Sequence, residues 1–264
     1  MSQPALHAPD DVRAADVYRS ILWNLRESGI PYLVGGTYAL EHHADLVRET
    51  KDLDLFVRRA DWSRVEETLG PHGIRCELVY THWLGKAHED GHFVDLIFAG
   101  GNGLVEVDDD WLAHGVPSVI LEVPVHLVAA EEMIWSKAFV MERERYDGGD
   151  VTHIILKSGH QIDWVRLIRR FAEQAAVLLS HLVIFQFVYP GHRSIIPDWV
   201  MDELWHRTRL TPEHPDRLCR GTLISREQYL PDITRGYVDA RAMPVGRMTT
   251  QQIQEWTEAI AKDR

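Results

Sequence analysis

Cysteine, long apolar segments and positive charge are all scarce in this 264-residue chain. The two cysteines, Cys76 and Cys219, have no paired spacing, so neither a disulfide framework nor a cysteine-based zinc site is predicted, and a reducing cytoplasm is the expected compartment. No apolar stretch reaches the length of a membrane span, and residues 1–16 lack the apolar core of a signal peptide. With 28 Lys and Arg against 40 Asp and Glu, the formal charge of −12 argues against a surface built for unspecific nucleic-acid binding.

Several common catalytic signatures are also missing. The chain has no P-loop, no Gly-x-Ser-x-Gly and no dinucleotide-binding fingerprint. Its 15 histidines include no His-Glu-x-x-His, and His42 and His43, adjacent on an expected helix, point about 100° apart and cannot chelate one ion together. We therefore interpret the histidines as ordinary polar residues.

Residues 30–57 carry the pattern that is most typical of a ligand site. Ile30–Val34 is a short apolar run that predicts a strand, and Gly35 and Gly36 end it in a tight turn that lets backbone approach a ligand closely. Thr37 then opens a helix expected over about residues 38–46. A hydroxyl and unsatisfied backbone N–H groups at a helix N-terminus favour phosphate binding.

The chain then returns in a second strand, expected over residues 51–57, that carries two carboxylates. Side chains alternate along a strand, so Asp52 and Asp54 share one face while Leu53 and Leu55 enter the core. Two carboxylates about 7 Å apart on one face suit magnesium. A later alternating strand, residues 92–98, carries Asp95 among apolar neighbours, and a charge there is costly unless it is paired or metal-bound.

A lone Gly-Gly is usually only a turn, and Asp-x-Asp is often a solvated strand face, but here the two occur together and in order. Gly35-Gly36-Thr37, then fourteen residues, then Asp52-Leu53-Asp54 resembles the signature of the nucleotidyltransferase superfamily to which DNA polymerase β belongs. It is similar in particular to the bacterial branch of AbiEii-like and MenT-like toxin enzymes and related uncharacterised nucleotidyltransferases.

The resemblance implies the following site. The glycine turn and Thr37 hold the triphosphate of an NTP such as ATP, and Arg48 also contacts the nucleotide. Asp52, Asp54 and Asp95 are the catalytic, metal-binding carboxylates, and two Mg²⁺ ions are expected. In the resembling enzymes a lysine on the helix after the sheet faces the nucleotide, followed by an arginine and an aspartate, and the matching residues here are Lys137, Arg143 or Arg145, and Asp147. The alternatives are a solvated Lys137, and helix capping by Asp147 and Asp150.

The expected elements predict a mixed α/β (α+β) fold. A small mixed sheet with flanking helices occupies residues 1–127, a helical domain residues 128–208, and an extended arm with a C-terminal helix residues 209–264. Within these, we expect one strand over 120–127, interrupted by Pro124 and therefore at an edge of the sheet, a break at Gly148 and Gly149, and one helix over about 163–187. The resemblance covers residues 20–158 only.

Two functions compete at this point. The first is a cytoplasmic, magnesium-dependent enzyme that moves a nucleoside monophosphate from an NTP to an acceptor hydroxyl. The second is a non-catalytic nucleotide-binding or partner-binding protein on the same fold, such as an antitoxin. For the acceptor, a small molecule or protein hydroxyl is preferred to tRNA, because Arg166, Arg169 and Arg170, the strongest basic cluster of the C-terminal half, are expected to pair with acidic neighbours.

Overall fold

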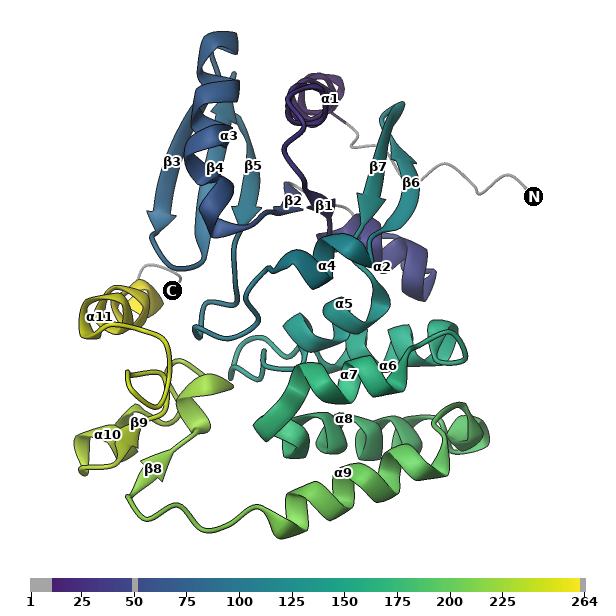
Figure 1. Ribbon diagram of the computed structural model, residues 1–264, viewed down its shortest axis with the longest axis vertical. Helices are drawn as coiled ribbons and strands as arrows, with labels where there is room; N and C mark the ends of the chain where they lie inside the picture. The colour runs from purple at the N-terminus through teal and green to yellow at the C-terminus, as the bar shows by residue number, and fades with distance from the viewer. Residues whose placement is uncertain (1–10, 49–51, 262–264) are drawn as a thin grey trace. The chain divides into compact units, whose positions relative to one another are not determined.

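The computed structural model describes residues 11–48 and 52–261 (Figure 1). The expected Lys51 start of the second strand lies outside these residues. The chain divides into two compact units, Met1–Ala129 and Ala130–Arg264. The first contains a sheet with helices and the second is mainly helical, so the predicted mixed α/β fold class is confirmed.

The first unit alternates helices and strands around one seven-stranded sheet. Its elements are α1 (Val12–Glu27), β1 (Leu33–Val34), α2 (Gly36–Ala44), β2 (Leu53–Phe56), α3 (Trp62–Leu69), β3 (Arg75–Tyr80), β4 (Leu84–Glu89), β5 (His92–Ile97), α4 (Asp109–Ala113), β6 (Val116–Ile120) and β7 (Val123–Leu127). The strand order is β3-β4-β5-β2-β1-β7-β6. The β2–β5 and β1–β7 pairs are parallel and the others antiparallel, which makes the sheet mixed.

Local chemistry explains how several of these elements begin and end. The Asp11 carboxylate accepts a hydrogen bond from the Arg13 backbone N–H and caps α1, and Gly29, at φ +67°, follows its end. Helix α1 buries its apolar stripe, including Ile21, Leu22 and Leu25, and contacts β5 and β7. The central strands β2 and β5 bury Leu53, Leu55, Val94 and Leu96 completely.

The strand expected over residues 120–127 is wrong in its start and in its edge position, because β7 begins at Val123 and lies between β1 and β6. Leu121 and Glu122 both have positive φ and form a two-residue turn between β6 and β7. Pro124 is tolerated in β7 because the short β1 pairs with β7 only at its far end, where Val34 faces Leu127. The missing N–H of proline therefore interrupts no ladder bond to β1.

The second unit consists of helices followed by a segment with little regular structure. Its elements are α5 (Ala130–Lys137), α6 (Gly148–Ser158), α7 (Trp164–Phe171), α8 (Ala175–Val188), α9 (Asp198–Leu210), β8 (Leu218–Cys219), α10 (Leu230–Thr234), β9 (Val238–Asp239) and α11 (Thr250–Glu258). The helix expected over 163–187 is interrupted, because Ala172 adopts φ 44° between α7 and α8. Gly148 and Gly149 form the first turn of α6 instead of breaking the helix pattern.

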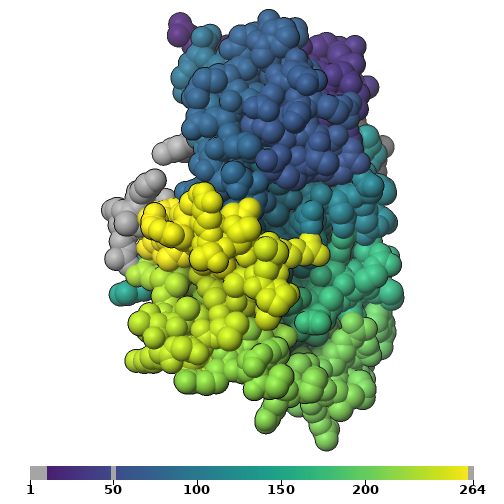
Figure 2. All heavy atoms as spheres, turned by 60° about the vertical axis from the view of Figure 1, so that its left-hand side comes forward, coloured from purple at the N-terminus to yellow at the C-terminus, as the bar shows by residue number. Residues whose placement is uncertain are grey.

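Residues 209–248 are not the extended arm that was expected. Short strands β8 and β9 pair in parallel, and Arg241, only 1% exposed, forms an ion pair with Asp239 at 2.8 Å. The Glu142 carboxylate accepts hydrogen bonds from the backbone N–H of Arg226 and the hydroxyl of Ser225. Figure 2 shows residues 209–248 and α11, coloured green to yellow, as one contiguous region.

The expectation that no apolar stretch reaches the length of a membrane span is wrong, because one segment, Trp164–Val188, is long and apolar enough by composition to cross a membrane. This is weak evidence, because core helices pass the same test. Within the segment, Arg166 and His181 are buried, and His181 Nε2 lies 2.9 Å from the Ala138 carbonyl oxygen.

Candidate active site

The glycine turn lies directly against strand β2. Gly35 is the N-cap of α2, and its N–H donates to the Asp54 carbonyl oxygen at 3.0 Å. Gly36 has φ +53°, and a Cβ at this residue would lie 2.0 Å from Asp54 Oδ2. Glycine is therefore required here both for its backbone conformation and for the space beside the carboxylate. The turn places the N-terminus of α2 next to Asp54.

Strand pairing brings a second carboxylate beside the first. Asp54 and Asp95 are direct partners in the parallel β2–β5 pair, so their Cα atoms are about 4.8 Å apart and their side chains project from the same face. Asp52 lies in a bend immediately before β2 and raises the pKa of Asp95 through its charge. The structure thus brings together the three carboxylates that the resemblance assigns to catalysis.

A lysine that the sequence analysis did not select completes this cluster. Lys86 in β4 is the direct partner of Asp95, and its Nζ donates to Asp95 Oδ1 at 2.6 Å. Burial raises the pKa of Asp95, and the hydrogen bond and charge of Lys86 act in the opposite direction. The ammonium group therefore partly offsets the cost of keeping a carboxylate in this position.

Tyr18 also belongs to this region and was likewise not selected. Its side chain on α1 is buried, and burial together with the nearby charges of Asp52 and Asp95 raises its pKa to about 12. The phenol therefore stays protonated at neutral pH, the form in which its hydroxyl donates a hydrogen bond. Helix α1 consequently faces the carboxylates with a hydroxyl instead of a purely apolar surface.

The sequence contains features that could have identified both Lys86 and Tyr18. Asp90 and Gly91, at φ 50° and 82°, form a two-residue hairpin turn, and an Asp-Gly turn of this length sets the register in which Lys86 faces Asp95. Tyr18 interrupts the apolar stripe of its helix with a polar tip, and such a group when buried usually finds a polar neighbour.

The other expected nucleotide-binding residues belong to different elements of the two units. Thr37 is half-buried in the first turn of α2, and Arg48 is exposed after the end of that helix. Lys137 is on α5 of the second unit, where its Nζ lies 3.1 Å from Asp147 Oδ2 and 2.7 Å from Asp150 Oδ2. Its side chain is 16% exposed, so it is not the solvated lysine of the alternative reading. The nucleotide contacts of Arg48 and Lys137 stay predictions.

Asp147 and Asp150 do more than the capping that was favoured for them. Asp147 occupies the N-cap position of α6, but its carboxylate makes no capping hydrogen bond and instead accepts bonds from Lys137 and Arg145. These two cations keep the pKa of Asp147 below its usual value in spite of burial. Asp150 lies within the first turn of α6.

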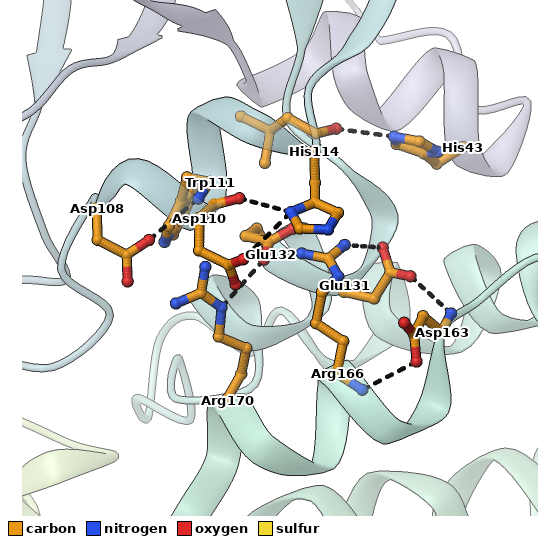
Figure 3. Close-up of polar contacts among 11 residues, drawn as sticks. His43, Asp108, Asp110, Trp111, His114, Glu131, Glu132, Asp163, Arg166 and Arg170 are labelled. Carbon is orange, nitrogen blue, oxygen red and sulfur yellow. Dashed lines mark hydrogen bonds and ion pairs between the residues drawn. The ribbon is translucent and has the colours of Figure 1, made fainter.

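The basic cluster of the C-terminal half is internally paired (Figure 3). Arg166, 4% exposed, contacts Glu131 at 2.7 Å and also forms an ion pair with Glu132. Arg170 Nε reaches Glu132 at 3.1 Å. The expected pairing with acidic neighbours is confirmed, but it occurs on a buried face and not on a solvated one, so Arg166 is not positioned to meet phosphates of an RNA.

The carboxylate cluster fits magnesium chemistry. Among the residues that the structure describes, no group of three or more His, Cys, Asp or Glu side chains is arranged to hold a metal ion. Mg²⁺, however, usually binds through one or two protein carboxylates together with waters and substrate phosphates. Asp54 and Asp95, side by side on one face and next to a helix N-terminus, provide such a set.

Comparisons with known proteins found solved structures that are similar at low identity. No family model and no curated protein matches the chain. A solution structure of the antibiotic-resistance factor ANT(2″)-Ia is similar, with TM-score 0.43 and 19% identity, covering 65% of this chain and 97% of that chain. The lincosamide antibiotic adenylyltransferase LnuA has TM-score 0.39 and 14% identity, covering 55% and 96%.

A third similar structure is a nucleotidyltransferase-like protein from Paracoccidioides brasiliensis, with TM-score 0.44 and 15% identity, covering 72% of this chain and 94% of that chain. Because these identities and TM-scores are low, the case for function rests on the geometry of the site. The AbiEii-like or MenT-like branch stays a prediction. The nucleotidyltransferase superfamily is therefore supported by the resemblance of the sequence motif, Gly35-Gly36-Thr37 followed by Asp52-Leu53-Asp54.

Proposed function

We propose that this protein is a magnesium-dependent nucleotidyltransferase that moves a nucleoside monophosphate from an NTP to an acceptor hydroxyl and releases pyrophosphate. The observation that carries the proposal is the contact between Gly36 and Asp54. It places a helix N-terminus, where phosphate binds readily, directly beside a carboxylate whose strand neighbour is Asp95. A turn or an acidic strand face alone does not require this contact.

Each residue has a defined role in this reaction. The N–H groups at the start of α2 and the Thr37 hydroxyl bind the triphosphate. Asp54 and Asp95, with Asp52 nearby, would hold Mg²⁺, which when bound would supply charge neutralisation for the phosphates and the leaving pyrophosphate. Asp95 also orients the attacking hydroxyl and accepts its proton. The hydroxyl oxygen bonds to the α-phosphorus as the bond from that phosphorus to the bridging oxygen breaks.

Three carboxylates gathered in one region also favour turnover over simple binding. Like charges repel one another, and a binding module gains nothing from gathering them. The acceptor is proposed to be a small molecule or a protein hydroxyl, because the basic residues Arg166 and Arg170 are already paired with glutamates. LnuA is named a lincosamide antibiotic adenylyltransferase, and a small antibiotic is one acceptor class to test here.

The direct test is transfer of label from NTPs. Purified protein is incubated with Mg²⁺, each α-³²P-labelled NTP, and pools of small hydroxylated molecules or proteins, and both the labelled acceptor and released pyrophosphate are measured. We expect Asp54→Asn to abolish transfer with its fold retained, because the site loses an anionic ligand for a hard cation. Asp90→Asn is the matched control, since Asp90 is exposed in the β4–β5 turn at φ 50°, which asparagine tolerates. Nucleotide binding without pyrophosphate release from any pool would instead support the non-catalytic alternative.

A further inference from the structure

Lys86 is held in place by two groups at once. Its Nζ lies 2.6 Å from Asp95 Oδ1 and 3.7 Å from the centroid of the Phe93 ring. Phe93 and Asp95 stand two residues apart on β5 and therefore on the same face, with Lys86 opposite Asp95 on β4. The ammonium group is thus fixed between a carboxylate and an aromatic ring, with the side chains of Lys86 and Asp95 only 22% and 16% exposed.

This arrangement leaves the two oxygens of Asp95 in different situations. Within residues 11–48 and 52–261, the bond that the structure shows to the Asp95 carboxylate is the one from Lys86 to Oδ1. A buried ion pair contributes little net stability relative to a well-packed apolar pair, because both charges lose their hydration. Its value here lies in geometry, since it restricts rotation of the carboxylate and leaves Oδ2 as the oxygen that can meet a ligand.

We propose that Lys86 is a positioning residue for Asp95 in the nucleotidyl transfer proposed above: it binds Oδ1, orients Oδ2 toward the attacking hydroxyl, and competes with a metal ion for this carboxylate. The orienting role of Lys86 in catalysis rests on the proposed function, whereas its competition with a metal ion for Asp95 does not. The competition for Asp95 follows from charge, because an ammonium group in contact with a carboxylate opposes the approach of a divalent cation to the same group.

The two roles predict opposite effects of Lys86→Met: metal affinity should rise and kcat should fall. Removing the competing cation should tighten binding of Mn²⁺, used as a probe in the absence of nucleotide, by about tenfold, the usual effect of one nearby unit charge. Loss of the oriented carboxylate should lower kcat by about a hundredfold with little change in KM for the NTP. A residue with a merely structural role would weaken metal binding and activity together.

The experiment compares wild type with Lys86→Met, Lys86→Gln and Lys86→Arg. Mn²⁺ affinity is measured by calorimetry, kcat and KM by label transfer, and folding by thermal unfolding. Lys86→Gln repeats the test should the methionine variant not fold, and Lys86→Arg, which keeps the charge, should retain Mn²⁺ affinity near wild type and part of kcat. Arg75→Met is the matched control, since Arg75 is a cation of the same sheet whose pair with Glu77 is exposed.

The outcomes separate this inference from the function on which it rests. Unchanged kcat in a folded Lys86→Met or Lys86→Gln variant, or weaker Mn²⁺ binding, overturns the role of Lys86. If wild type transfers no nucleotide, the proposed function fails, and the Mn²⁺ measurement alone then decides whether Lys86 competes for Asp95. Tighter Mn²⁺ binding in the neutral variants and not in Arg75→Met supports the competition.

Discussion

Replacing Gly36 by alanine tests whether the glycine turn serves the carboxylate or only the backbone. Gly36 has φ +53° and Gly29 has φ +67°, so an alanine at either residue carries a left-handed backbone penalty of about 1–2 kcal/mol. Gly36 and Gly29 differ in the space that is available for an added Cβ atom. A Cβ at Gly36 meets Asp54 Oδ2 at 2.0 Å and Asp54 Cγ at 2.9 Å, whereas a Cβ at Gly29 has no atom within 4 Å.

The structure therefore gives the difference between the two variants a specific cause. In Gly36→Ala the Asp54 carboxylate must rotate out of its rotamer, at a further cost of about 1 kcal/mol, and it leaves the position beside the helix N-terminus. We expect Gly29→Ala to lose about 1–2 kcal/mol in the free energy of unfolding and to keep its nucleotide affinity. Gly36→Ala should lose about 1 kcal/mol more and, in addition, lose nucleotide binding and transfer.

Urea unfolding measures the free energy of unfolding, and calorimetric titration of an NTP in the presence of Mg²⁺ measures the nucleotide affinity. A bulkier Gly36→Val substitution should enlarge both effects, since a β-branched side chain fills more of the space that a phosphate needs. Equal nucleotide affinity and equal activity in Gly36→Ala and Gly29→Ala would refute the reasoning, because the turn would then have no role in placing Asp54 beside the helix N-terminus.

Three further predictions concern groups outside the carboxylate cluster. Burial lowers the pKa of His43, whose Nε2–H donates to the Val128 carbonyl at 2.8 Å, to about 4. Because the unfolded chain binds that proton near pH 6.5, stability should be complete above this pH and fall by up to about 3 kcal/mol as the pH drops toward 4. His43→Gln should flatten this slope in pH-dependent urea unfolding. Arg166→Met removes the buried cation that pairs with both Glu131 and Glu132 and leaves Glu132 with Arg170 alone, so it should cost about 3–5 kcal/mol, whereas Arg169→Met, at an exposed residue, should cost below about 1 kcal/mol in the same assay. In a gel shift, bulk tRNA should show no salt-sensitive retention, and clear retention at moderate salt would contradict the preference for a small-molecule or protein acceptor.

Local patterns in the sequence were sufficient for the parts of the site that depend on short-range geometry. The glycine turn, the helix after it and the alternation around Asp54 follow from backbone conformation and a two-residue period, which neighbours along the chain determine. The C-terminal helix is similar, because the capping box of Thr249 and Gln252 involves residues three apart. The same rules missed the β6–β7 hairpin, whose turn residues, Leu121 and Glu122, rarely adopt positive φ.

Only the tertiary structure decided which distant groups meet. Asp54 and Asp95 become neighbours through the parallel pairing of β2 and β5, and no periodicity within either strand encodes that choice of partner. Residues 209–248 show little regular structure, yet they fold through ion pairs such as Arg241–Asp239 and through the contacts of Glu142 with Arg226. Periodicity along the sequence does not predict these contacts. Strand pairing and buried ion pairs are selected by the free energy of the whole packed core, so residues far apart in sequence acquire a shared role only when the chain has folded.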